Sequence, residues 1–288
     1  MKLEADGPNA EQIRYWNETI GPRWVEMGDL LDAQIAPLGL AAIERARPEA
    51  GEKALDVGCG CGQTSRQLGE RVGPGGSVFG IDISAPMLER ARARAAGHAN
   101  LRFANADAQT HAFRERFDLV FSRFGVMFFA DPAAAFANLR RALRPRGRLA
   151  FVCWQGIDRN PWMLIPLRAV VGIVELPPPP PPGAPGPFAF ADPEHVQGIL
   201  ASGGFEKIAL EPLEGELSIG AGGDLERAVQ FTLQIGPVSA ALREAGEDAR
   251  RRAVDAIREA LAPLVTPTGV RAGYATWIAT AAAPGELG

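Results

Sequence analysis

The fold of this chain is decided by residues 53–84, KALDVGCGCGQTSRQLGERVGPGGSVFGIDIS. The stretch begins with a short apolar run and continues through a loop that has glycine at every second position, Gly58, Gly60 and Gly62. A segment with helical character follows, and a second apolar run then ends at Asp82. This order predicts a strand, a glycine loop, a helix, a second strand and an acid. Such a unit holds an adenosine-containing cofactor at the ends of a parallel sheet.

The spacing within the loop separates two kinds of cofactor. A dinucleotide fingerprint, G-x-G-x-x-G, would have its third glycine at position 63, where this chain has Gln63. The loop instead reads D-x-G-x-G-x-G, with Asp56 at the end of the strand. A carboxylate is a poor neighbour for a pyrophosphate, but it suits the ammonium and sulfonium of S-adenosylmethionine (SAM), directly or through water. The loop therefore favours SAM, and Asp82 can accept hydrogen bonds from the hydroxyls of its ribose.

Composition limits the class of protein. The 288 residues, 47% of them hydrophobic, suffice for one sizeable α/β domain with additions or for one and a half domains. A net charge of −4 predicts no strong field toward nucleic acid or an anionic membrane. No apolar run is long enough to span a bilayer, and the acidic, polar start predicts no secretion. The odd number of cysteines, three, favours a reducing compartment, so a cytoplasmic location is expected.

Two of the cysteines, Cys59 and Cys61, have the close spacing of a metal-binding pair. They lie inside the glycine loop, and neither a second pair nor a nearby histidine completes a ligand set. We therefore expect no metal site and interpret both as small residues where bulk is not tolerated.

Strands and helices alternate regularly between residues 53 and 153, which predicts a doubly wound, mostly parallel sheet. The expected fold is α/β and Rossmann-like, with seven strands, N-terminal helices that Pro37 and Gly39 interrupt, and a helical insertion after the fifth strand. One long helix is expected over 238–264, and the six prolines at 177–182 predict a stiff loop. The expected parts are an N-terminal helical cap (1–50), a Rossmann-like core (51–155), a substrate-side helical or lid insertion with strand six (156–262) and a final strand (263–288).

The glycine loop, Asp82 and two later segments together resemble the class I SAM-dependent methyltransferases. The segments are FDLVFSRFGVMFFADP at 117–132 and LRPRGRLAFVCW at 143–154, and both are similar to those of the ubiquinone and menaquinone biosynthesis type. The resemblance covers residues 50–155 well and the rest loosely. It implies SAM as cofactor, S-adenosylhomocysteine (SAH) as product, and a small, apolar or aromatic acceptor. Oxygen, carbon and nitrogen acceptors all stay open, and the resemblance favours oxygen or carbon. A quinone is in doubt, because Arg123-Phe124 replaces the Arg-Asn pair usual in the quinone enzymes.

The resemblance also implies which residues hold the cofactor. Asp107 corresponds to an acid that accepts a hydrogen bond from the exocyclic amine of adenine, and a helix N-cap is its alternative role. Ile83 and Met87 would flank the adenine, and Ser122 would lie near the methionine part of SAM. The candidate cofactor-binding residues are Tyr15, Trp24, Asp56, Gly58, Gly60, Gln63, Asp82, Ile83, Met87, Asp107, Ala108 and Ser122.

The residues beyond the fourth and fifth strands are expected to face the acceptor, because ligands bind at the carboxyl ends of parallel strands. Aromatic faces there suit a sulfonium and an apolar or cationic acceptor, and ordinary packing of the N-terminal helix is the alternative. No general base is assigned, since surface positions account for His98, His111 and His195. The candidate acceptor-binding residues are Trp16, Arg123, Phe124, Met127, Trp154 and Trp162.

Other classes of function stay open. An NAD(P)-dependent oxidoreductase is opposed by Gln63 and by the lack of a Tyr-x-x-x-Lys pair. A SAM-binding sensor or partner domain without turnover would keep the same cofactor motifs. A nucleic-acid methyltransferase is disfavoured by the negative charge and by the missing Asn/Asp-Pro-Pro-aromatic motif at 122–125. The expected partners are a small-molecule methyl acceptor and a second copy of the chain in a homodimer, with no nucleic acid and no membrane.

Overall fold

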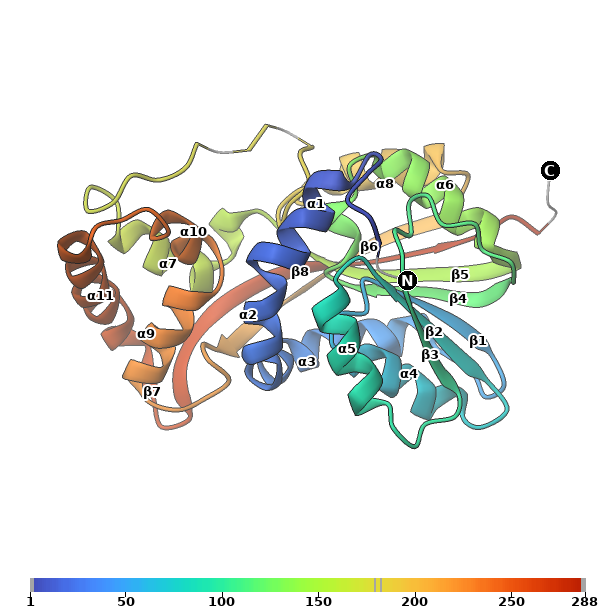
Figure 1. Cartoon of the computed structure of the whole chain (residues 1–288), viewed down its shortest axis with the longest axis horizontal. Helices are drawn as coiled ribbons and strands as arrows, with labels where there is room; N and C mark the ends of the chain where they lie inside the picture. The colour runs from blue at the N-terminus through green and yellow to red at the C-terminus, as the bar shows by residue number, and fades with distance from the viewer. Residues whose placement is uncertain (1–2, 179, 182, 286–288) are drawn as a thin grey trace.

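The computed structural model describes residues 3–178, 180–181 and 183–285, and it is built on one twisted sheet (Figure 1). The strand order is β3-β2-β1-β4-β5-β8-β6, and β7 pairs with β8 off this path. The strands are β1 (Lys53–Val57), β2 (Ser77–Asp82), β3 (Leu101–Asn105), β4 (Phe117–Arg123), β5 (Leu143–Trp154), β6 (Glu206–Ser218), β7 (Val265–Thr266) and β8 (Gly269–Ala282).

Strands β1 to β5 pair in parallel, whereas β8 runs antiparallel to both β5 and β6. The predicted doubly wound, mostly parallel sheet is therefore confirmed. The two-residue strand β7 is added to the seven strands that were expected.

Helices cover both faces of this sheet. In Figure 1, α3, α4 and α5 lie below it, and α6 and α8 lie above it. The helices are α1 (Ala10–Arg14), η1 (Tyr15–Thr19, a π-helix), α2 (Gly21–Glu26), α3 (Gly28–Ala46), α4 (Gln63–Val72), α5 (Ala85–Arg94), η2 (Val126–Phe128), α6 (Pro132–Ala142), η3 (Ile157–Arg159), α7 (Pro161–Ala169), α8 (Pro193–Ser202), α9 (Leu225–Gln234), α10 (Pro237–Ala241), α11 (Glu247–Leu261) and η4 (Ala262–Leu264).

The expected interruption of the N-terminal helices at Pro37 and Gly39 is wrong. Helix α3 continues through both residues, and the break falls at Met27, between α2 and α3. Gly39 serves a tertiary contact instead, because a Cβ at this position would lie 2.8 Å from Cδ of Arg123. The small residue lets the Arg123 side chain pass across α3.

The sheet extends to one side of the core as a long, curved pair of strands, β6 and β8 (Figure 1). Helices α7, α9, α10 and α11 pack on one another around this extension. The single helix expected over 238–264 is wrong, since residues 242–246 separate α10 from α11. Helix α8 contacts α6 and β6 on the core side, whereas α7 and α9–α11 contact one another. The division of the chain at 156 and 262 stays a prediction. Two residues of the proline run, 179 and 182, lie outside the described residues.

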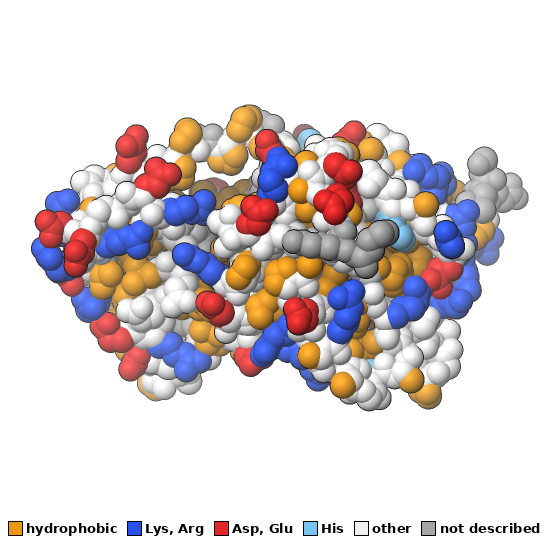
Figure 2. Space-filling view, viewed as in Figure 1, with side chains coloured by type: hydrophobic (Ala, Val, Ile, Leu, Met, Phe, Trp, Pro, Cys, Tyr) orange, Lys and Arg blue, Asp and Glu red, His pale blue; other side chains and the backbone are white. Residues whose placement is uncertain are grey.

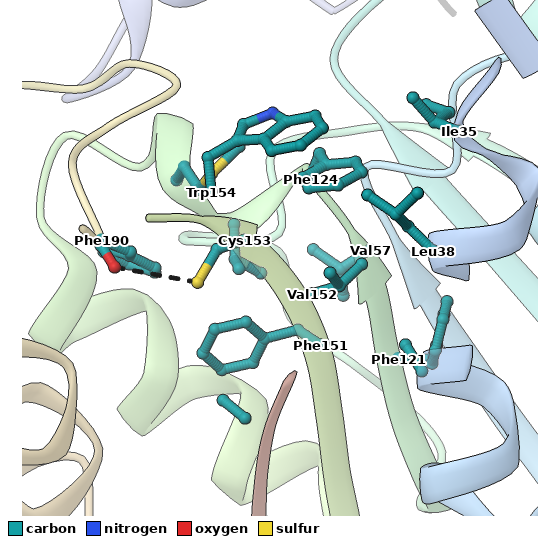
Figure 3. Close-up of a cluster of buried hydrophobic side chains, with 14 of the residues drawn as sticks. Ile35, Leu38, Val57, Phe121, Phe124, Phe151, Val152, Cys153, Trp154 and Phe190 are labelled. Carbon is teal, nitrogen blue, oxygen red and sulfur yellow. Dashed lines mark hydrogen bonds between the residues drawn. The ribbon is translucent and has the colours of Figure 1, made fainter. Parts of the chain in front are cut away.

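The interior of the α/β core is strongly aromatic. Phe117, Phe121, Phe136, Phe151 and Phe190 are fully buried. Figure 3 shows Phe151 and Phe121 extending from neighbouring strands of the sheet, with Cys153 Sγ beside the backbone oxygen of Phe190. This packing holds the ends of β4 and β5 in place.

On the face drawn in Figure 2, basic and acidic side chains are interspersed, and neither sign forms a continuous patch. Within the described ranges, no helix is both long enough and apolar enough to cross a bilayer.

Candidate functional site

A pocket opens at the carboxyl ends of the parallel strands, where the strand order reverses between β1 and β4. Such a reversal is the usual ligand site of an open α/β sheet. The pocket holds about 1140 Å³ of empty space, part of it open to solvent. Its lining is Asn9, Trp16, Trp24, Gly28, Leu31, Asp32, Val57, Gly58, Cys59, Gly60, Cys61, Thr64, Ile81, Asp82, Ile83, Met87, Ala106, Asp107, Ala108, Arg123, Phe124, Gly125, Met127, Phe128, Phe129, Trp154 and Pro187.

The glycine loop forms the floor of the pocket in a conformation that favours glycine. The φ angles of Gly58, Gly60 and Gly62 are +65°, +55° and +81°. A Cβ on Gly58 would lie 2.7 Å from Cα of Gly125, so the loop and the end of β4 approach each other too closely for a side chain.

Asp82 anchors the loop and also lines the pocket. One carboxylate oxygen accepts a hydrogen bond from the Gly60 N–H at 2.8 Å, and the other accepts one from the Ser84 N–H at 2.8 Å. Burial raises the pKa of Asp82, and the N–H groups of Ser84 and Gly60 oppose that rise. Each carboxylate oxygen retains a lone pair, so Asp82 can accept further hydrogen bonds from a ligand.

Asp56 lies behind the loop and does not line the pocket. It is fully buried, and Oδ2 accepts hydrogen bonds from Thr64 Oγ1 at 2.7 Å and Ser65 Oγ at 2.6 Å. Its Oδ1 has no partner, and burial raises the pKa of Asp56 to about 6. The carboxylate thus ties the end of β1 to the first turn of α4, and the contact predicted between Asp56 and the cofactor, directly or through water, stays a prediction.

The raised pKa of Asp56 predicts a pH dependence of stability. A carboxyl whose pKa is higher in the folded state binds its proton more tightly there, so the free energy of unfolding falls as the pH rises from about 4 to about 6. A rise of about two pKa units corresponds to about 3 kcal/mol. Asp56→Asn cannot titrate, and we expect its stability relative to the wild type to increase by up to this amount between pH 4 and pH 7.

Urea unfolding of both proteins across this pH range measures the effect. Asp158→Asn, at an exposed position, controls for the pH dependence of the rest of the chain. If the free energies of unfolding of the wild type and of Asp56→Asn change equally with pH, the pKa of Asp56 is not raised by folding.

Asp107 lines the pocket beyond β3 and is held by the N-terminal segment. Its Oδ2 accepts a hydrogen bond from Asn9 Nδ2 at 2.8 Å, and its Oδ1 accepts one from the Gln109 N–H at 2.8 Å. Asn9 Oδ1 in turn accepts the Ala130 N–H at 2.7 Å. Asp107 therefore closes a turn while it faces the pocket, and Asn9 joins the lining although no sequence motif marks it.

The N-terminal segment covers the pocket through the π-helix η1. Ser84 Oγ donates to the Trp16 oxygen at 2.8 Å, and Asn17 Nδ2 donates to the Ile83 oxygen at 2.9 Å. Trp16 and Trp24 consequently line the pocket. Tyr15 is not part of the lining and packs edge-on against Trp16, with ring centroids 6.0 Å apart.

An aromatic wall stands on the β4–β5 side of the pocket. Phe124 and Trp154 stack at 4.3 Å with an interplanar angle of 9°, and Figure 3 shows the two rings together at the ends of β4 and β5. Phe124 has φ +59°, a left-handed conformation that is uncommon for an aromatic residue and recurs at functional sites. Trp162 packs behind Trp154 at 5.4 Å and does not line the pocket. Met127 and Phe128 continue the apolar wall.

Two further predicted residues support the site from outside the lining. Ser122 is fully buried, and its Oγ donates to the Val57 oxygen at 2.8 Å and accepts the Gly125 N–H at 3.2 Å. Gln63 Oε1 accepts a hydrogen bond from Arg123. Both side chains hold the strand ends and the loop together, and their predicted contacts with the cofactor stay predictions.

Thirteen of the eighteen candidate residues thus meet in one pocket, and no histidine is part of its described lining. The five candidate residues outside the lining are Tyr15, Asp56, Gln63, Ser122 and Trp162. Within residues 3–178, 180–181 and 183–285, no group of three His, Cys, Asp or Glu side chains is arranged to hold a metal ion. Some lining residues that sequence reasoning missed lie inside the motifs, such as Cys59, Thr64 and Gly125, whereas Asp32, Asn9 and Pro187 lie outside every motif.

Residues 54–147 match the family model of the methyltransferase domain. Aklanonic acid methyltransferase DauC of Streptomyces sp. (strain C5) is 39% identical over 118 residues, which cover 40% of this chain and 54% of that protein. Nocamycin O-methyltransferase of Saccharothrix syringae is 37% identical over 139 residues, covering 46% and 49%. The chain spans about half the length of these curated relatives.

Solved structures share the fold. The phosphoethanolamine N-methyltransferase 2 of Haemonchus contortus in complex with SAM has a TM-score of 0.52 at 20% identity, over 86% of this chain and 52% of that chain. The YcgJ protein of Bacillus subtilis has a TM-score of 0.56 at 16% identity, over 86% of this chain and 98% of that one. At these identities the likeness concerns the fold.

Proposed function

We propose that this chain, whose residues 54–147 form a class I SAM-dependent methyltransferase domain, methylates a small, apolar or aromatic molecule with SAM as the methyl donor. One observation carries the proposal: Asp82 on its glycine loop and the Phe124–Trp154 wall line the same pocket. A nucleoside site and an aromatic site are thereby continuous.

The chemistry of the lining fits SAM better than a dinucleotide. Asp82 has lone pairs for two ribose hydroxyls, and Ile83 and Met87 offer apolar surface beside it. Gly58 and Gly60 line the pocket with backbone alone, and a Cβ on Gly60 would lie 2.9 Å from Cε of Met87. In the described lining, Arg123 is the one cation, so it could match only one of the two negative charges of a pyrophosphate. These features oppose the oxidoreductase alternative.

When bound, SAM supplies a methyl group on a positively charged sulfur, which is already an activated leaving group. The residues of the chain then have to hold the acceptor in line and exclude water. Trp16, Phe128 and Phe124 form apolar surfaces suited to both tasks, and Trp16 and Phe128 meet edge to face at 5.2 Å. Because no histidine is part of the described lining, the proposal favours an acceptor that ionises without a strong base.

The acceptor class remains part of the proposal. Two relatives are named for aklanonic acid and for O-methylation in nocamycin, and both names point to acceptors that contain oxygen. We extend this class to the present chain and favour an oxygen acceptor, with carbon second. The cytoplasmic location, the homodimer and the lack of nucleic-acid and membrane partners stay predictions.

Thermal unfolding with SAH, SAM, NAD and NADP in parallel tests the cofactor. A ligand at 100 times its dissociation constant stabilises the folded state by about 2.7 kcal/mol, which raises the melting temperature by several degrees. We expect a shift with SAH and SAM alone. A shift with NAD or NADP alone would favour the oxidoreductase. Binding of SAH without transfer of labelled methyl to any of a panel of phenols, enols and carboxylic acids would favour the SAM-binding domain without turnover.

Phe124→Ala is expected to weaken binding of the acceptor far more than binding of the cofactor. The substitution removes the ring that stacks on Trp154, and such a pair contributes about 0.5–1.5 kcal/mol beyond its buried area. We expect the KM of the acceptor found in the panel to rise about tenfold or more, and the SAH dissociation constant to stay within about threefold. Initial-rate kinetics and calorimetry measure the two values.

Phe113→Ala is the matched control, because Phe113 contacts Phe117 and His111 and lies outside the pocket. A loss of SAH binding in Phe124→Ala, with an unchanged acceptor KM, would mean that Phe124 belongs to the core rather than to the acceptor wall.

A further inference from the structure

Two opposite charges lie side by side in the pocket, Asp32 from α3 and Arg123 from the end of β4. Arg123 Nη2 donates to Asp32 Oδ1 at 2.9 Å, and the two side chains are only 9% and 12% exposed. A pair this well buried loses hydration on both sides and is weak evidence of stabilisation. Its place in the lining of a ligand site suggests that it is kept for recognition.

The pair is held firmly by its neighbours. The Arg123 guanidinium also donates to Gln63 Oε1, and Asp32 Oδ2 accepts a hydrogen bond from Arg94 Nη1 at 2.7 Å. Gly39 makes room for the stem of Arg123. These contacts leave N–H donors on Arg123 and lone pairs on Asp32 unused, so each side chain can still bind a group of opposite charge.

The order of the strands puts this pair on the far side of the glycine loop from the adenosine residues. Along the sheet edge the strands lie in the order β3, β2, β1 and β4. Asp107, Asp82, the glycine loop and Arg123 therefore lie side by side in that order. A nucleoside whose ribose binds Asp82 and whose tail crosses the loop therefore has its tail at the end of β4.

Two chemically different surfaces meet at the end of β4. The side facing α3 bears the charges of Asp32 and Arg123, and the side facing β5 bears the stacked rings of Phe124 and Trp154. The amino-acid end of SAM is a zwitterion, which needs a cation and an anion, whereas an apolar acceptor needs the rings. In the described lining, Arg123 is the sole cation available to a carboxylate.

We infer that Arg123 binds the carboxylate and Asp32 the ammonium of the amino-acid end of SAM. The inference rests on the proposed function and deepens it. It gives Arg123 a role different from the acceptor contact predicted from sequence, because the side chain contacts Asp32 and Gly39 of α3.

Calorimetry with two nucleosides tests the inference without measuring turnover. SAH carries the amino-acid end, and 5′-methylthioadenosine lacks it. We expect the wild type to prefer SAH by about tenfold to hundredfold, the range of charge-assisted hydrogen bonds. In Arg123→Met this preference should disappear, while affinity for 5′-methylthioadenosine stays within about twofold.

Asp32→Asn and a second ligand pair separate the two roles. Arg123→Met should lose the preference for SAM over decarboxylated SAM, whereas Asp32→Asn should keep it. Arg94→Met is the matched control, because Arg94 pairs with Asp32 from outside the lining, and it should retain the preference for SAH.

Removal of one member of a buried pair can unfold a protein, so the double variant Asp32→Asn/Arg123→Met provides a neutral pair with the same expected loss of preference. An unchanged preference for SAH in Arg123→Met or in the double variant would overturn the inference, as would an equal loss of affinity for both nucleosides. A wild type that binds neither nucleoside would overturn the proposed function as well. If the wild type prefers SAH and the variants keep that preference, only the role of the Asp32–Arg123 pair is wrong.

Discussion

Asp82→Ala is expected to weaken SAH binding by about 2–4 kcal/mol, roughly 30-fold to 1000-fold. The substitution removes the acceptor for two ribose hydroxyls. It also deprives the Gly60 and Ser84 N–H groups of their partner, which loosens the glycine loop on which the nucleoside would lie. Isothermal titration calorimetry with SAH measures the loss.

The matched control is Asp118→Ala. Asp118 also accepts a backbone hydrogen bond, from the Lys53 N–H at 2.9 Å, and it pairs with Arg144, but it lies outside the pocket. We expect this variant to bind SAH like the wild type. Wild-type SAH affinity in Asp82→Ala would show that the ribose lies elsewhere.

Gly58→Ala is expected to reduce SAH affinity about hundredfold or more and to lower the melting temperature. The φ of +65° costs a residue with a side chain about 1–2 kcal/mol. In addition, the new Cβ would lie 2.7 Å from Cα of Gly125, so the loop and the end of β4 must separate. Because both segments line the pocket, this separation disrupts the site itself.

Gly73→Ala separates the effect of backbone strain from the effect of the contact between the loop and Gly125. Gly73 has nearly the same φ, +66°, but a Cβ there would meet nothing within 4 Å. With ψ −171° the backbone of Gly73 lies in a region that is essentially restricted to glycine, so we expect Gly73→Ala to lower the melting temperature and to leave SAH affinity unchanged. Equal losses of SAH affinity in the two variants would mean that backbone strain, and not the approach of β4, governs the effect.

The sequence by itself determined the fold class, the position of the glycine loop and most of the pocket. These features depend on short-range patterns: apolar runs of strand length, glycines that adopt positive φ, and an acid at a strand end. Gly58, Gly60, Asp82 and Asp107 could be predicted because parallel strands bring their carboxyl ends to one edge of the sheet.

The tertiary structure alone decided which side chains face the ligand. Asp56 satisfies the loop motif, yet its carboxylate is buried against Thr64 and Ser65, a matter of hydrogen-bond partners that spacing does not reveal. Asn9 and Asp32 join the site from segments without a motif, through contacts with Asp107 and Arg123 that lie 98 and 91 positions away in the chain. Contacts over such separations depend on how helices pack on the sheet, and local sequence does not encode that packing in any readable pattern.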